Sequence, residues 1–260
     1  MNPIVADEPT AECTEVAEQL GNGFSMETTL ETLTVEVQHA WYLPLKRMTD
    51  VVLSLILAVV LAPAVLVAAL LVKYTSRGPA FYCQTRLGRN EREFRMYKLR
   101  TMVHDAEAGT GPIWASQDVE RVTTIGRILR PTQIDEFPQL LNVLLGHMSL
   151  IGPRPERPEI AHQLEWKVGS YSERVKVRPG ITGLAQLRLP PDSDLHSVRQ
   201  KLTMDLYYIE HLSPLLDLRI LAFTVLYFLR SVGRLLRRRM SIPHVADVHD
   251  HMQRKKSPPK

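Results

Sequence analysis

Two adjacent carboxylates, Asp135 and Glu136, stand between a basic neighbourhood and an apolar run. Arg127 and Arg130 precede the pair, and Arg154 follows the apolar run. Carboxylates among arginines suit chemistry on a phosphorylated substrate, with a divalent cation neutralising the charge that the arginines do not. An Asp side chain is ionised at neutral pH and needs no base to act as a nucleophile, and a Glu can hold Mg²⁺ on a diphosphate. The alternative is an acidic pair on a solvated helix start, where Asp-Glu usually occurs.

Proline and glycine residues predict the elements that position these side chains. Pro138 lacks an N–H, so it belongs in the first turn of a helix over Gln139–Leu145, which places the carboxylate pair at or just before the helix start. Free N–H groups and the positive end of the helix dipole gather there. A short helix over Thr123–Leu129 carries the preceding arginines toward the pair. Gly152–Pro155 is a rigid, extended turn that fixes the direction of Arg154.

The remaining pattern predicts an α+β, mostly helical fold with a small β-hairpin. Ala80–Gln84 and Glu93–Arg100 are expected strands around a turn at Leu87–Asn90. Near the C-terminus, Leu215–Leu229 is apolar, too short to span a bilayer, and followed at once by arginines. We expect a helix at the membrane interface with the arginines on anionic head groups. The alternative is a core helix with a solvated basic end.

A long apolar segment predicts insertion into a membrane. Val51–Val72 has 22 residues without a charge, which at 1.5 Å per residue reach about 33 Å, enough for a bilayer core. Pro63 near its middle predicts a kink, so the helix either crosses tilted or bends back to the face that it entered. Basic residues flank both ends, which favours a re-entrant, monotopic arrangement. The heavier positive load follows the segment, so the main domain is expected on the cytoplasmic face.

Charge is divided unevenly along the chain of 260 residues. Residues 1–40 hold eight of the 28 acidic residues and none of the 32 basic ones, so the remainder carries 20 acidic residues and a net charge of +12. A basic body points to an anionic partner: nucleic acid, a lipid surface or a phosphorylated substrate. The two cysteines form no disulfide framework and no metal-binding spacing. We expect four parts: an acidic flexible leader (1–40), a membrane helix (41–75), a cytoplasmic catalytic domain (76–230) and a basic disordered tail (231–260).

Several motifs in one register resemble the bacterial sugar transferases, the monotopic polyprenyl-phosphate phosphoglycosyl transferases, from about Leu45 to Arg230. In chain order the motifs are Lys46-Arg47-x-x-Asp50, Gly78-Pro79-x-Phe81-Tyr82-x-Gln84-x-Arg86-x-Gly88, Phe94-x-x-Tyr97-Lys98-x-Arg100-Thr101-Met102, Thr123-x-x-Gly126-Arg127-x-x-Arg130, Asp135-Glu136-x-Pro138-Gln139-x-x-Asn142-Val143, Met148-Ser149-x-x-Gly152-Pro153-Arg154-Pro155 and Arg178-Pro179-Gly180-x-Thr182-Gly183-x-x-Gln186. So many matches in order make a chance similarity very improbable.

The resemblance implies an enzyme that moves a sugar-1-phosphate from a UDP-sugar onto undecaprenyl phosphate and releases UMP. Asp135 would be the nucleophile that forms a sugar-phosphoryl-aspartate, and Glu136 the Mg²⁺ ligand. The residues that would bind substrate or phosphate are Lys98, Arg100, Arg130, Arg154 and Arg178. The implied location is the bacterial inner membrane, where the enzyme begins exopolysaccharide or another lipid-linked glycan. Nothing in the local sequence itself says which carboxylate does which.

Other readings stay open at this stage. A membrane-anchored scaffold could bind anionic lipid or nucleic acid without catalysis, but the basic residues stand singly on Pro/Gly turns around a carboxylate pair, not in a stripe with aromatics. We therefore expect no nucleic-acid partner. A regulator that binds UDP-sugar without turnover is disfavoured by the intact Asp135-Glu136 pair. Glucose, galactose and N-acetylated hexosamines all remain possible sugars, with a tilt to a hexose-1-phosphate donor, and a homodimer is possible.

Overall fold

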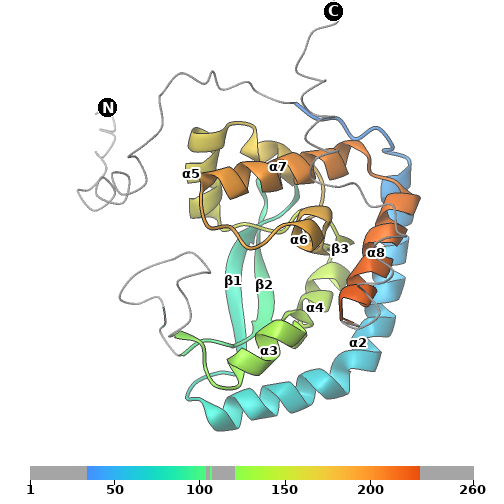
Figure 1. Ribbon diagram of the computed structural model, residues 1–260. Helices are drawn as coiled ribbons and strands as arrows, with labels where there is room; N and C mark the ends of the chain where they lie inside the picture. Colours follow the sequence, from blue (N-terminus) through green and yellow to red (C-terminus); the bar gives the residue numbers. More distant parts are fainter. Residues whose placement is uncertain (1–33, 104–105, 107–120, 229–260) are drawn as a thin grey trace, which may run out of the picture. The chain divides into compact units, whose positions relative to one another are not determined.

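A computed structural model describes residues 34–103, 106 and 121–228 of the chain. The elements in chain order (Figure 1) are α2 (Tyr42–Thr75), β1 (Phe81–Leu87), η1 (Arg89–Glu91), β2 (Glu93–Leu99), α3 (Gly126–Thr132), η4 (Ile134–Glu136), α4 (Gln139–Leu144), β3 (Ser149–Ile151), α5 (Pro158–Val168), η5 (Tyr171–Lys176), β4 (Gly180–Thr182), α6 (Leu184–Arg188), α7 (Leu195–Glu210) and α8 (Pro214–Phe228). The prediction of a mostly helical fold with a small β-hairpin is confirmed.

The hairpin β1–β2 is antiparallel, and its register runs from Phe81 opposite Leu99 to Leu87 opposite Glu93. Alternation along β2 buries Phe94 and Met96 against the core while Glu93 and Arg95 stay exposed, as a half-buried strand requires. The first strand begins at the second residue of the predicted segment and extends to Leu87. The sequence did not predict the second sheet, in which β3 and β4 pair in parallel.

The hydrophobic core lies among α4, β3, α6, α7 and α8. Its fully buried members include Val143, Leu206, Ile209 and Ile220. The predicted helix over Gln139–Leu145 is observed as α4. The predicted helix over Thr123–Leu129 begins three residues later, as α3, because the Thr123 hydroxyl and backbone carbonyl accept the N–H groups of the first helical residues.

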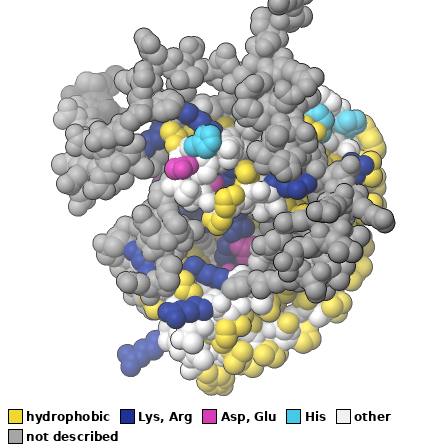
Figure 2. All heavy atoms as spheres, viewed as in Figure 1, with side chains coloured by type: hydrophobic (Ala, Val, Ile, Leu, Met, Phe, Trp, Pro, Cys, Tyr) yellow, Lys and Arg dark blue, Asp and Glu magenta, His cyan; other side chains and the backbone are white. Residues whose placement is uncertain are grey.

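Helix α2 has 34 residues and contains Pro63 without a break in the helix, although Figure 1 shows it changing direction part-way along its length. Among the described residues it is the one helix long and apolar enough to cross a membrane, judged by length and composition. Only 17% of its apolar window is buried. Hydrophobic side chains gather along the edge of the space-filling view where α2 lies (Figure 2). The membrane helix is therefore supported, whereas its re-entrant course stays a prediction.

The first turns of α2 dock on the rest of the protein through polar side chains spaced by four, which place them on one helix face: Tyr42, Lys46, Asp50 and Ser54. Asp217 of α8 accepts hydrogen bonds from the Tyr42 hydroxyl at 3.0 Å and from Lys46 Nζ at 2.6 Å. The Asp50 carboxylate accepts the Leu150 N–H at 3.1 Å. This polar docking fixes the base of α2 and leaves its apolar middle uncovered.

Helix α8 has two different faces. Leu216, Ile220 and Phe223 are buried in the main core, as the core-helix alternative requires, whereas Leu215 and Leu218 are exposed. The arginines predicted to follow α8 and the predicted basic tail lie outside the described residues. Most of the predicted leader does too, but Val35 is only 1% exposed, and its backbone carbonyl accepts Lys176 Nζ at 2.8 Å.

Candidate active site

Glu136 is the centre of a tight charge cluster. Lys98 Nζ lies 2.9 Å from its Oε1, and Arg154 reaches both of its oxygens, at 2.5 Å and 3.3 Å. Burial by itself would raise the pKa of Glu136, but Arg154 and Lys98 together hold that pKa well below its ordinary value. Glu136 is therefore ionised at any working pH and immobilised on two sides.

Asp135 is different, although it precedes Glu136 directly. Its side chain is buried, yet it forms no ion pair with any residue that the structure describes. Burial and then the charge of Glu136 raise the pKa of Asp135, while Lys98 and Arg130 act in the opposite direction. A carboxylate with no cation bound to its oxygens keeps its lone pairs available for attack on an electrophile.

The chain brings the pair to this position through a broken helix. Gln133 adopts a left-handed conformation with φ 53°, which ends α3 and starts the single turn η4 that carries both carboxylates. Asn142 on α4 then fastens this region to the hairpin, because its amide accepts the Tyr97 N–H at 3.0 Å and donates to the Arg95 carbonyl at 2.7 Å. These two bonds flank Met96 and fix β2 just before Lys98, whose side chain contacts Glu136.

Neighbouring residues hold the backbone of Arg154 in place. The turn that carries it follows β3, whose pairing with β4 is so close that an added Cβ on Gly152 would lie 2.5 Å from the Arg178 carbonyl. Arg174 donates to the Arg154 carbonyl at 3.0 Å and to Asp205 at 2.6 Å. The prediction of a rigid turn at Gly152–Pro155 agrees with this backbone. Sequence reasoning missed Arg174 and Asp205, which lie in no chemical motif and meet only in the folded chain.

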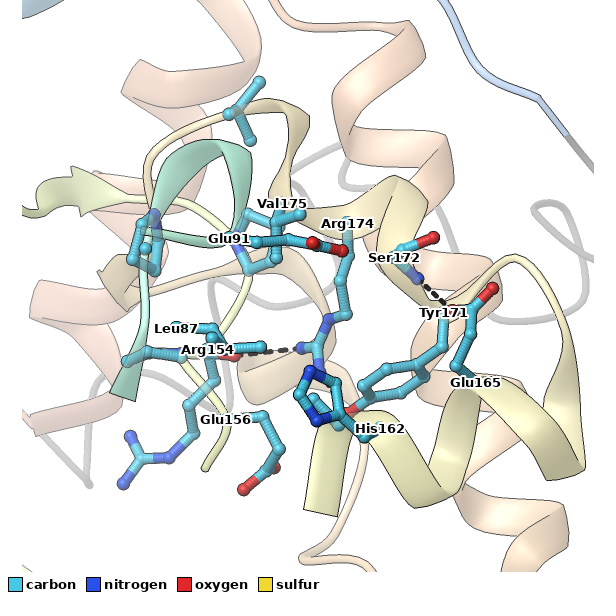
Figure 3. Close-up of a pocket in the computed structure, with 16 residues that line it drawn as sticks. Leu87, Glu91, Arg154, Glu156, His162, Glu165, Tyr171, Ser172, Arg174 and Val175 are labelled. Carbon is cyan, nitrogen blue, oxygen red and sulfur yellow. Dashed lines mark hydrogen bonds between the residues drawn. The ribbon is translucent and has the colours of Figure 1, made fainter. Parts of the chain in front are cut away.

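A cleft of about 510 Å³, counting space open to solvent, is lined in part by this turn, through Pro153, Arg154 and Pro155. Figure 3 shows Arg174 and Tyr171 side by side in it, with the Arg154 side chain extending away from them. Glu156 and His162 also line the cleft. Arg154 thus lines the cleft and also contacts Glu136, whereas neither carboxylate of the pair lines the cleft.

The structure sorts the predicted cationic site residues into two groups. Lys98 and Arg154 contact Glu136, and Arg130 acts electrostatically on Asp135 while its Nε donates to Thr101 at 3.1 Å. Arg100 instead donates to the carbonyl and hydroxyl of Ser76, at the end of α2.

Arg178 donates to the Gly146 carbonyl at 3.0 Å, at the end of α4 away from the carboxylates. Arg127 is exposed on α3. A phosphate-binding role for Arg100 and Arg178 stays a prediction.

The donor set fits a magnesium ion shared with a substrate better than one held by protein alone. Within the described ranges, no group of three or more His, Cys, Asp or Glu side chains lies close enough to hold a metal ion. Mg²⁺ usually takes one or two carboxylates, with phosphate oxygens and water completing the shell. Glu136 Oε2 has one long contact, at 3.3 Å to Arg154, and so retains a lone pair for a cation. Glu136 is thus the residue that would hold the ion against a diphosphate.

Comparison with known proteins places the chain in a family. The sequence model described as bacterial sugar transferase matches residues 41–231. An exopolysaccharide production protein, PSS, of Rhizobium leguminosarum bv. phaseoli is 41% identical over 194 residues, which cover 70% of this chain and 94% of that protein. A UDP-glucose:undecaprenyl-phosphate glucose-1-phosphate transferase of Caulobacter vibrioides is 43% identical over 69% of this chain and 68% of its own length.

A third relative widens the range of sugars. The UDP-N-acetylgalactosamine-undecaprenyl-phosphate N-acetylgalactosaminephosphotransferase of Aeromonas hydrophila is 38% identical over 74% of this chain. The match spans 45% of that protein's length, so this chain corresponds to less than half of it. Because the family match covers the membrane helix, the carboxylate pair and α8 together, the chain belongs to the bacterial sugar transferase family of enzymes.

Proposed function

We propose that the enzyme transfers a sugar-1-phosphate from a UDP-sugar to undecaprenyl phosphate and releases UMP. The observation that carries the proposal is the contrast between the two carboxylates: Glu136 is bound by two cations, whereas Asp135 has no ion-pair partner among the described residues. The names of the relatives supply the substrate class, because each of the two transferases acts on undecaprenyl phosphate and takes a UDP-sugar.

In the first step, an oxygen of the Asp135 carboxylate attacks the β-phosphorus of the UDP-sugar. The bond from that phosphorus to the bridging oxygen breaks, and UMP leaves with the electron pair. The product is an acyl phosphate, a sugar-phosphoryl-aspartate. Arg154 and Lys98, fixed by Glu136, lie where they can stabilise charge on the phosphoryl oxygens. Mg²⁺, held by Glu136, would neutralise the diphosphate.

In the second step, a phosphate oxygen of undecaprenyl phosphate attacks the same phosphorus, and the bond to Asp135 breaks. The carboxylate is regenerated, and the lipid leaves as a sugar-bearing diphosphate. Both nucleophiles are already anions, so neither step needs a general base. One phosphoanhydride is exchanged for another through an acyl phosphate that is itself high in energy, so the sequence needs no external energy source.

The membrane arrangement completes the proposal. We place the enzyme in the inner membrane of a bacterium with α2 re-entrant and the catalytic domain on the cytoplasmic face, where UDP-sugars are made. Polar docking of the base of α2 and the exposed apolar side chains of its middle support this placement. A membrane-impermeant thiol reagent checks the cytoplasmic placement in a Cys13→Ser variant, whose remaining cysteine, Cys83, is exposed on β1 and should react only after spheroplasts are opened.

The transfer is tested by withholding the lipid acceptor. Full-length enzyme with Mg²⁺ and a UDP-sugar should release one equivalent of UMP and gain the mass of one sugar-phosphate, and Asp135→Asn should do neither. Glu159→Gln, at a carboxylate that is 66% exposed, serves as the matched control. Screening UDP-glucose, UDP-galactose and the UDP-N-acetylhexosamines in this assay identifies the sugar. Binding of UDP-sugar without UMP release would indicate a regulator instead.

A further inference from the structure

Two arginines from distant parts of the chain, Arg47 and Arg178, meet where α4 ends, and Arg89 lies within electrostatic reach of Arg178; these three are the α4-end arginines. Arg47 extends from α2 and donates to the Val143 carbonyl at 2.6 Å and to the Leu144 carbonyl at 3.1 Å. Arg178 donates through Nε to the Gly146 carbonyl. An added Cβ on Gly146 would lie 3.5 Å from the Arg47 guanidinium. Backbone carbonyls, which carry no net charge, therefore hold two of the three cations in place.

The α4-end arginines have almost no acidic counterpart. Among residues 34–103 and 121–228, none of them forms an ion pair with a carboxylate. Partial burial, and then the charges of Arg47 and Arg89, lower the pKa of Arg178, and Asp50 is the acidic group that acts against them. Asp50 itself is buried and accepts a backbone N–H. The cluster thus keeps an excess of positive charge at the surface.

Exposed apolar side chains stand close to these arginines along the chain. On α2, Leu45 and Met48 are 45% and 66% exposed, and Leu141 of α4 and Leu145, which caps that helix, are 52% and 61% exposed. The two residues of each pair are three or four positions apart and so share a helix face. The two helices pack against each other. A ligand that satisfies both surfaces has an anionic head and an apolar body.

We propose that the α4-end arginines bind the phosphate headgroup of an anionic phospholipid, whose acyl chains lie along the exposed apolar side chains of α2 and α4. Free phosphate or a nucleotide would neutralise the arginines but leave those side chains in water. The six residues of α4, about 9 Å in length, separate this site from the carboxylate pair. The proposal rests on the membrane placement given above and not on the transfer reaction.

The test counts bound lipid directly. Full-length protein in a non-ionic detergent is titrated with phosphatidylglycerol, with phosphatidylcholine as the neutral comparison, and the complexes are resolved by native mass spectrometry. Wild type should bind phosphatidylglycerol preferentially. Arg89→Gln and Arg178→Gln should each weaken this binding about tenfold, the effect of losing one charge-assisted hydrogen bond. Arg92→Gln removes the same charge three residues from Arg89 and should change nothing.

Each result decides between lipid and the other occupants. Equal binding by wild type and Arg89→Gln, or equal losses in Arg89→Gln and Arg92→Gln, would overturn the proposal. Displacement of the lipid by an equal concentration of inorganic phosphate would show a free-phosphate site instead. Arg89 is exposed, so its replacement tests the site even if Arg178→Gln proves unstable. Asp135→Asn should bind phosphatidylglycerol as wild type does. The proposals of lipid binding and of sugar-phosphate transfer are therefore tested independently.

Discussion

The two ends of α4 both gather positive charge, but they hold it differently. Before the helix, Lys98 and Arg154 are bound to Glu136, and Arg130 lies within electrostatic reach of Asp135. After the helix, backbone carbonyls hold two of the α4-end arginines, Arg47 and Arg178, and Asp50 is the buried acidic group that acts on Arg178. Carboxylates fix the direction of the cations at the first end, which suits chemistry. At the second end the charge stays uncompensated, which suits a ligand from outside.

The largest expected effect separates the two ends by activity. Asp135→Asn removes the proposed nucleophile, so UMP release from a UDP-sugar should fall at least about 10³-fold, as for removal of a nucleophile in other covalent enzymes. The measurement is steady-state UMP release with undecaprenyl phosphate present. Near-normal turnover in this variant would remove Asp135 from the nucleophile role.

Replacing Arg154 with Lys keeps the positive charge before α4 but removes the guanidinium group, with its two parallel N–H donors. Arg154 binds both oxygens of Glu136, which a lysine ammonium cannot do with the same geometry. We expect kcat for UMP release to fall roughly 10²-fold. Arg127→Lys, at an exposed position on α3, is the control and should keep the wild-type kcat. An effect confined to KM would mean that Arg154 binds substrate without acting on the transition state.

The adjacent carboxylates should respond to pH with opposite signs. Because the pKa of Asp135 is raised in the folded protein, its ionisation opposes folding above that pKa, so Asp135→Asn should raise the Tm at neutral pH. The pKa of Glu136 is lowered, so its stabilising contribution is full above the unfolded-state pKa and declines as pH falls below it. Glu136→Gln should therefore lower the Tm at neutral pH.

The difference for Asp135→Asn should shrink as the pH falls toward about 4, the unfolded-state pKa of Asp, because the Asp135 carboxyl is then protonated in both states. The difference for Glu136→Gln should persist down to about pH 4 and shrink only below it. Thermal unfolding of wild type and the two variants in detergent across this pH range gives the comparison. Shifts of the same sign for the two variants would show that the neighbouring carboxylates share one electrostatic environment, against the structure.

The smallest effect concerns the second end alone. Arg47→Gln removes two hydrogen bonds to α4 carbonyls and should destabilise the protein by about 1–3 kcal/mol. The loss appears as a lower Tm in thermal unfolding. Arg89→Gln, whose side chain is exposed, should leave the Tm unchanged while weakening lipid binding. If Arg47→Gln has no effect on stability, its bonds to α4 are not maintained in the membrane protein.

Local signals predicted the elements that carry the site. The proline after Asp135-Glu136 predicted the helix start at α4, and two short strand segments around a turn at Leu87–Asn90 predicted the hairpin. The contacts that aim the side chains were not predictable, because Arg174 and Asp205 are 31 residues apart, and the parallel pairing of β3 with β4 joins two segments of three residues each. Strands of three residues are too short to show an alternating pattern of apolar and polar residues. The glycines that let the two strands approach closely resemble those of an ordinary turn.

The motifs also failed to separate cations by role. Lys98 and Arg100 share one motif. Residues two apart point to the same side only within a strand, and β2 ends at Leu99, between the two. Lys98 therefore contacts Glu136, whereas Arg100 follows the end of β2 and contacts Ser76. A residue type within a motif indicates charge, and only the fold assigns its partner.

The polar docking of α2 has a consequence for synthesis. Lys46 leaves the ribosome 171 residues before its partner Asp217. At about 5–20 residues per second, this interval lasts roughly 10–35 s. During that time the apolar part of α2 can already enter the bilayer, while the Lys46 side chain remains without its buried acceptor. The docked base of the helix can thus be completed only after Asp217 has been made, when the apolar part of α2 has already had time to reach the bilayer.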